Sequence, residues 1–88
     1  MKLVLVEWVD SHSGRGWQDA ERIQSAAALL HCRSVGWIAA ETKDVLVLVS
    51  SISSESRGEG FMQGSGDMVI PKCAILKTTA YLRICSKD

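Results

Sequence analysis

Residues 10 to 17 read Asp-Ser-His-Ser-Gly-Arg-Gly-Trp, and this stretch gathers the side-chain types of a hydrolytic triad: an acid, an imidazole and hydroxyls. A triad needs its nucleophile, base and orienting acid to converge from a rigid scaffold beside a separate oxyanion hole. Side chains of neighbouring residues in one loop point in divergent directions instead. The sequence therefore predicts no catalytic residue, and we expect a protein that is not an enzyme.

The same stretch also has features of an anion-binding loop. Its glycines would let backbone amides approach a phosphate, and the helix predicted to follow would present its positive end. The spacing is not that of a P-loop, however, and no Gly-Lys-Ser/Thr follows. The competing interpretation is a structural corner, in which Gly14 and Gly16 adopt positive φ and Trp17 anchors the helix in the core. The candidate ligand-binding residues are Asp10, His12, Arg15 and Trp17.

The cysteines and histidines do not have the spacing of a metal site. Cys32, Cys73 and Cys85 form an odd set with no Cys-x-x-Cys pair and no histidine at zinc-finger distance. We expect reduced thiols, no metal and no cofactor. His31 falls near the end of the predicted helix, where the helix dipole favours an imidazole. Neither His12 nor His31 has a partner residue at the spacing of metal ligands.

Composition limits the classes of partner. Ten basic residues balance ten acidic ones in a chain of 88, which removes the long-range field that attracts proteins to nucleic acids or anionic membranes. Trp8, Trp17 and Trp37 could form a stacking platform for bases, but without interleaved basic residues we expect them in the core. The N-terminal ten residues predict a first strand rather than a signal peptide. No segment has the ~18 apolar residues of a membrane span.

Hydrophobic periodicity predicts the elements that must position these residues. Residues 2–9 predict a strand with Val4, Val6 and Trp8 on one face and leucines on the other. Apolar residues at three- and four-residue steps predict an amphipathic helix from Gln18 to His31. A hairpin of strands 33–41 and 45–52 follows, with Gly36 at a bulge or a tight bend. We expect a mobile loop over 53–67, a strand ending at Ile70, a helical turn at Pro71 and a last strand over 75–82.

The order of these pieces resembles a group of small bacteriophage proteins with an SH3-like β-barrel. The matching segments are Trp8-Val9-Asp10-Ser11, Gly16-Trp17, Ser34-Val35-Gly36-Trp37 and Ile70-Pro71-Lys72 through Ile75. The resemblance implies a mainly β, α+β fold: a small SH3-like or Sm-like five-stranded barrel with one helix inserted after the first strand. It would form a single domain over 1–82, followed by a tail over 83–88. It implies a phage origin and therefore a place in the cytoplasm of the host bacterium, but no activity.

These features predict a nonenzymatic binding or assembly module that acts through contacts with itself or with a host or phage protein. The first and third strands are apolar on both faces, and a barrel interior covers only one face, so we expect a homo-oligomer, first of all a dimer. Alternatively, the loop over 53–67 covers the gap with Phe61 and Met62. The alternative functions are binding of a small anionic ligand, such as a nucleotide signal in counter-defence, and RNA binding by an Sm-like barrel, which zero net charge disfavours.

Overall fold

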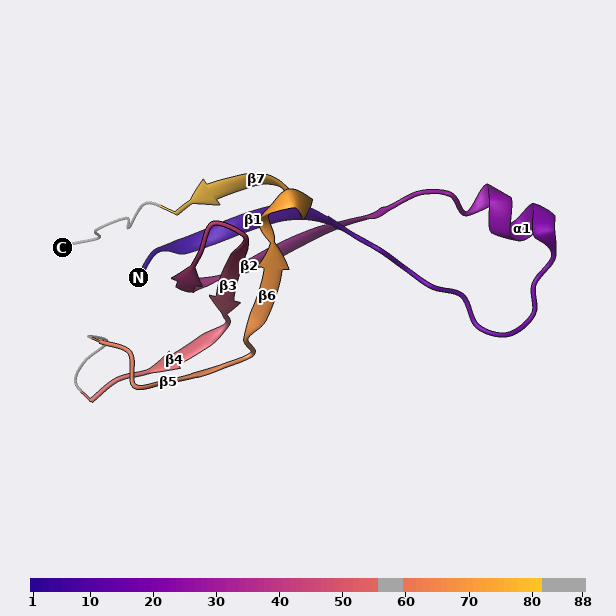
Figure 1. Cartoon of the computed structure of the whole chain (residues 1–88). Coiled ribbons are helices and arrows are strands. Elements are labelled where there is room, and N and C mark those ends of the chain that lie inside the picture. Colours follow the sequence, from indigo (N-terminus) through magenta and orange to yellow (C-terminus); the bar gives the residue numbers. More distant parts are fainter. Residues whose placement is uncertain (56–59, 82–88) are drawn as a thin grey trace.

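A computed structural model describes residues 1–55 and 60–81 of the chain. Residues 56–59 of the predicted loop, Leu82, Cys85 and the tail over 83–88 lie outside these residues, so the predictions for them are untested. The chain is mainly β, with one short α-helix and one 3-10 turn in the described part (Figure 1). The elements are β1 Leu3–Asp10, α1 Ala20–Ser25, β2 Leu30–Glu41, β3 Val45–Val49, β4 Ser51–Ser53, β5 Gln63–Ser65, β6 Met68–Pro71, η1 Lys72–Ala74 and β7 Ile75–Ala80.

Five of the strands form one antiparallel sheet in the order β6-β3-β2-β1-β7. The sheet curls, but among the described residues no ladder joins its two edge strands, so the expected barrel is not closed. At one edge, the sequence explains why no further strand pairs with the sheet. β6 has only four residues and ends at Pro71, which has no backbone N–H to donate to a further strand. The coarse expectation of a small, mainly β fold is confirmed.

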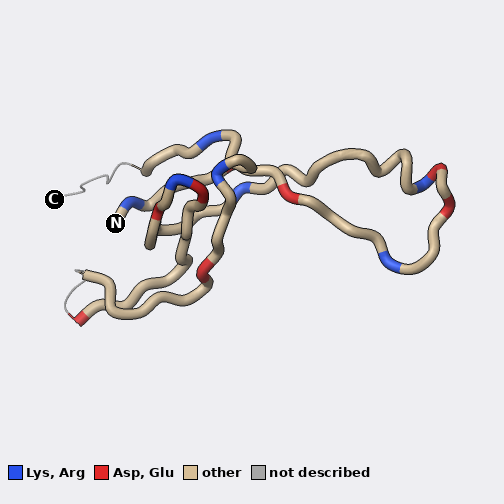
Figure 2. The backbone as a smooth tube through the Cα atoms, in the orientation of Figure 1, with Lys and Arg blue, Asp and Glu red and all other residues tan. Residues whose placement is uncertain are grey.

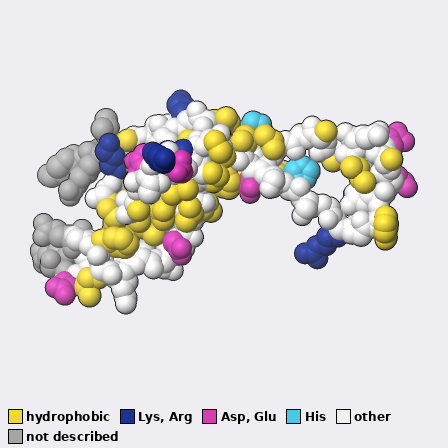
Figure 3. Space-filling view, in the orientation of Figure 1, with side chains coloured by type: hydrophobic (Ala, Val, Ile, Leu, Met, Phe, Trp, Pro, Cys, Tyr) yellow, Lys and Arg dark blue, Asp and Glu magenta, His cyan; other side chains and the backbone are white. Residues whose placement is uncertain are grey.

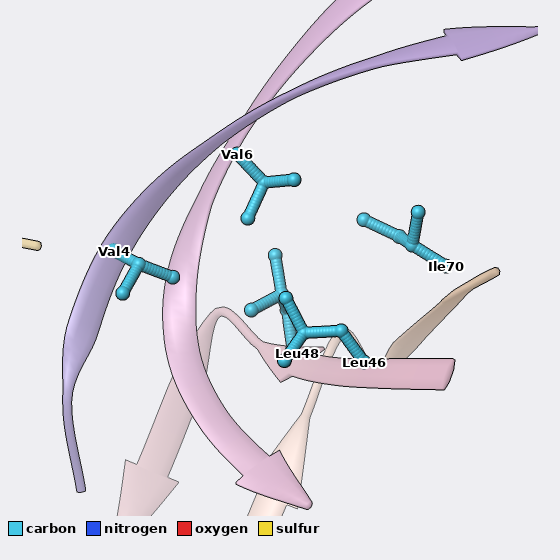
Figure 4. Packing of buried hydrophobic residues seen from close by; sticks show 5 residues of the cluster. All are labelled: Val4, Val6, Leu46, Leu48 and Ile70. Carbon is cyan, nitrogen blue, oxygen red and sulfur yellow. The ribbon is translucent and has the colours of Figure 1, made fainter. Parts of the chain in front are cut away.

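The core lies on the concave face of the curled sheet. Side chains from three strands meet there: Val4, Val6, Leu46, Leu48 and Ile70 (Figure 4). Ile70 and Val6 are completely buried, at 0% exposure each. The period-two pattern of β1 is confirmed, because Trp8 also packs against this cluster while Leu3 and Leu5 on the other face remain half-buried.

Three polar contacts fix elements around this core. The indole Nε1 of Trp8 donates to Ser34 Oγ at 3.0 Å, and Ser34 Oγ lies 3.8 Å from Met68 Sδ, which connects β1, β2 and β6. Beyond the other end of β6, Lys72 Nζ lies 2.7 Å from Glu41 Oε2. The hydrogen bond and charge of Lys72 hold the pKa of Glu41 below its ordinary value.

Gly36 permits a close approach between β2 and β3. A methyl group there would lie 2.8 Å from the carbonyl oxygen of Val49 and 3.3 Å from Leu48 Cβ, so no side chain fits without movement. This close approach accounts for glycine at position 36, whereas the expected tight bend stays a prediction. The β-bulge itself lies further along the strand, between Ile38 and Ala40.

The predicted helix from Gln18 to His31 is wrong in length and in placement. The helix covers only Ala20–Ser25 and contains no buried residue. A helix this short is marginal in water unless an apolar face packs on something, and this one has no core beneath it. Its predicted last residues, Leu30 and His31, belong to β2, where they pair with Asp10 and Val9.

The predicted mobile loop over 53–67 contains more regular structure than expected. β4 and β5 form a two-stranded ladder in which Ser51 pairs with Ser65 and Ser53 with Gln63. The chain leaves this hairpin toward β6 at Gly66, whose φ of 71° favours glycine. The expectations for the following segment are confirmed: β6 reaches Pro71, a single 3-10 turn follows, and β7 begins at Ile75.

Candidate functional site

Residues 11–29 form an arm that projects from one end of the sheet (Figure 1). β1 and β2 pair as far as Asp10 and Leu30; beyond this point the ladder ends and the two segments separate, with α1 near the far end. The arm gives the chain an elongated outline of 58 × 26 × 24 Å. The arm therefore presents to solvent the very stretch in which the candidate functional residues lie.

Few internal bonds hold the arm. His12 Nε2 donates to the carbonyl oxygen of Ala28 at 2.7 Å and so joins the outgoing segment to the returning one. Near the tip, Gln18 Nε2 donates to the carbonyl oxygen of Arg15 at 3.3 Å. Both bonds are exposed, so water competes for each of them. Two exposed hydrogen bonds do not make the arm rigid by themselves, so its rigidity depends on other contacts.

The arm exposes large apolar side chains that a monomer normally buries. No side chain of the arm is buried, and Trp17 is fully exposed. Ile23 and Leu29 are each 59% exposed. The expectation that Trp17 anchors a helix in the core is therefore wrong, because the arm carries this residue away from the core altogether. Figure 3 shows hydrophobic side chains on the arm as well as over β3 and β6.

The returning half of the arm also lacks charge. No Lys, Arg, Asp or Glu occurs from Ile23 through Cys32, whereas Asp19, Glu21 and Arg22 cluster at the tip (Figure 2). Within the uncharged stretch, residues 26–30 read Ala-Ala-Ala-Leu-Leu and are all exposed. Five consecutive exposed apolar residues are uncommon on a soluble surface and are characteristic of contact surfaces. Hydrophobic periodicity predicted a helix here, so these residues were not identified as part of an exposed surface.

The structure does not bring the four candidate ligand-binding residues together. Asp10 lies at the base of the arm, where its carboxylate accepts the backbone N–H of Ser11 at 2.8 Å. Arg15 makes no ion pair within the described part of the chain. His12 alone of the four lines the hollow between the two halves of the arm. An arrangement this dispersed gives no convergent site.

The hollow itself has a volume of about 640 Å³ and is open to solvent. Its polar side chains include His12, Gln18 and Arg22, and its apolar wall comes from Ile23 and the alanines that follow. All of these side chains except the half-buried Gln18 are exposed. The size is within the range of small-molecule sites, about 300–1,000 Å³, but such sites normally bury most of their ligand.

The anion-binding features of the glycine loop are only partly present. Gly16 has a φ of 70°, as a structural corner requires. Gly14 is not among the glycines with positive φ, and the Gln18 side chain lies against it. α1 begins four residues after Gly16, and the acidic Asp19 occupies its N-cap. A carboxylate at that position would repel an anion, so the loop and the helix do not form a phosphate cradle.

The remaining candidate groups are also dispersed. Trp8 faces the core, Trp37 occupies the opposite face of the sheet, and Trp17 lies on the arm, so the three do not form a stacking platform. Cys32 and Cys73 are free thiols. In residues 1–55 and 60–81, no group of three or more His, Cys, Asp or Glu could hold a metal ion.

Comparison of the chain with models of protein families, with curated proteins and with solved structures finds no match. Within the described ranges, no helix is long and apolar enough to cross a membrane. The chemistry of the arm and of the sheet must therefore indicate the function.

Proposed function

We propose that the chain is a nonenzymatic binding and assembly module that acts through protein contacts, with the arm over 11–29 as its contacting element. The assembly includes a homo-oligomer, of which a closed dimer is the simplest form. The observation that carries the proposal is the full exposure of Trp17 at the end of an arm with no buried side chain. Exposed tryptophan is characteristic of the residues that contribute most to protein–protein binding.

The setting in which this module acts follows from the resemblance described above. The segments around Trp8, Gly16, Ser34 and Ile70 support an SH3-like protein encoded by a phage and present in the cytoplasm of the infected bacterium. In that setting, the partners are a second copy of the chain or a host or phage protein. An arm of this kind contacts its partner by apolar burial rather than by long-range attraction, because the chain has no net charge.

Photo-crosslinking from the arm tests the proposal. Trp17 is replaced by the photoreactive p-benzoylphenylalanine, the protein is produced in bacteria, and the crosslinked peptides are identified by mass spectrometry. Met62, which is 59% exposed but lies outside the arm, receives the same replacement as a matched control. We expect crosslinks to protein from position 17 and few from position 62. Equal or absent crosslinking from the two positions contradicts the proposal.

A second candidate function is supported by the hollow of about 640 Å³ between the halves of the arm. Arg22 provides hydrogen-bond donors there, and a small anionic ligand such as a nucleotide would contact its guanidinium group. The absorbance of the purified protein separates the two functions. A bound nucleotide adds a band near 260 nm that unfolding and filtration remove, whereas an assembly module shows the protein spectrum alone.

A further inference from the structure

The convex face of the sheet carries a second uncovered apolar surface, which we call the outer belt. Cross-strand pairs place its members side by side: Leu5 with Val35, Leu3 with Trp37, and Val47 with Val69. Val35 is 54% exposed and Val69 is 58% exposed, although both lie in strands. The belt comprises Leu3, Leu5, Val35, Trp37, Val47 and Val69.

The chain's own hairpin covers only one end of this face. Val49 continues the face beyond Val47 and is buried, and its side chain lies close to Gly64 of β5, against which the Phe61 ring also lies. Phe61 and Met62 remain 45% and 59% exposed, so they do not extend this cover across the belt. The prediction that the loop over 53–67 covers the uncovered face of the sheet is therefore confirmed only at Val49.

The total surface of the chain indicates how much is left uncovered. The accessible area is 7239 Å², whereas a compact monomer of 9.6 kDa exposes about 5,100 Å². Even if the eleven undescribed residues are counted as fully extended chain, an excess of about 900 Å² remains. A protein–protein interface of standard size buries about 800 Å² on each partner. The excess therefore has the size of one interface.

A second copy is the partner that covers both surfaces with one kind of contact. The arm and the belt are both apolar and both belong to the same chain, so a contact between them, made twice in a closed dimer, buries both. A foreign partner on the arm would leave the belt in water. Charge does not oppose the contact, because the arm carries two basic and two acidic residues: Arg15, Arg22, Asp19 and Glu21.

We infer that the arm of one chain lies across the outer belt of a second copy, with the uncharged returning segment over 23–30 and Trp17 as the apolar contacts. This inference rests on the proposed function and specifies its partner and its receiving surface. The belt crosses the four adjacent strands β6, β3, β2 and β1, a width of about 14 Å, and about five residues of extended arm are enough to span it.

Complementation between two variants tests this contact. The arm variant carries Trp17→Ser and Leu29→Ser, and the belt variant carries Val35→Thr and Val69→Thr, which keep β-branched residues in the strands. All four positions are at least half exposed in the single chain, so both variants should fold, and circular dichroism checks this. Met62→Ser is the control. The arm variant is labelled with ¹⁵N, and native mass spectrometry counts each species.

We expect self-association of the wild type and of the control, a loss of at least tenfold in dimer affinity for each variant alone, and ¹⁵N/¹⁴N heterodimers in the mixture. The mixture recovers association because it retains one intact arm and one intact belt. A mixture that associates no better than either variant alone overturns the inference, as does a belt variant that dimerises like the wild type. Crosslinks from position 17 to a different protein, with a monomeric wild type, overturn this inference and the proposed homo-oligomer, but leave in place the proposed binding of a partner protein through the arm.

Discussion

His12 Nε2 lies 2.7 Å from the carbonyl oxygen of Ala28, sixteen residues along the chain, and this is the hydrogen bond that joins the two halves of the arm. A carbonyl oxygen only accepts, so the Nε2 nitrogen carries the proton in this contact. The bond is exposed at both ends, and it shapes the arm without contributing a buried contact.

Alanine at Asp10, His12 or Arg15 should change the free energy of unfolding by about 0.5 kcal/mol or less, because all three side chains are exposed. His12→Ala should in addition increase the fast backbone motion of the arm, measured by ¹⁵N relaxation, because the two halves are no longer joined. Urea unfolding of each variant supplies the free energies. A loss of several times the expected value would show that the arm takes part in the cooperative core.

Ile70→Ala should destabilise the fold by about 2–5 kcal/mol, since Ile70 is fully buried in the cluster of three strands. The adjacent Val69 lies on the opposite face of β6 and provides the control. Val69→Ala should change the unfolding free energy by less than about 1 kcal/mol in dilute solution. Chemical denaturation at submicromolar concentration makes the comparison, and equal losses from the two variants would contradict the assignment of the faces.

Gly36→Ala should cost about 1–3 kcal/mol, because the new methyl group meets the backbone carbonyl of Val49, which cannot move without shifting β3. Gly14→Ala is the matched control. At that position the new methyl group meets only the flexible side chain of Gln18, so little stability should be lost. Thermal unfolding of the two variants separates these cases, and an unaffected Gly36→Ala would show that β2 and β3 are further apart.

Lys72→Met should return the pKa of Glu41 toward its ordinary value of 4.5, because it removes the hydrogen bond and the positive charge that lower the pKa. A carboxyl group with a lowered folded-state pKa stabilises the fold above its ordinary pKa, and this contribution is lost as pH falls through the folded-state value. The ion pair is exposed, so the effect on stability should be small. NMR titration of the Glu41 carboxyl carbon measures the shift, and an unchanged pKa in the variant would rule out Lys72 as its cause.

Local patterns were sufficient to predict most of the sheet. Alternation in β1 identified Val4 and Val6 as core residues, and Pro71 predicted the end of β6, because both signals depend on neighbours along the chain. The prediction of a closed barrel was wrong, because closure depends on whether two edge strands that are distant in the sequence meet.

The helix and the site show where local patterns failed. Periodicity assigned Ala27 and Leu30 to a helix, but pairing with Asp10 takes Leu30 into β2 and leaves the arm with nothing to pack on. The same error concealed the exposed run over 26–30, since an amphipathic helix would have buried half of it. The uncharged stretch from Ile23 through Cys32 was the available signal, but lack of charge is equally expected of a buried segment and so does not by itself identify an exposed one.

Sedimentation equilibrium of the wild-type chain, from low to high micromolar concentration, tests most directly the claim that the arm and the belt assemble this protein. We expect a mass that rises with concentration from the 9.6 kDa of one chain to that of at least two chains. A single species of one-chain mass up to high micromolar concentration would contradict it.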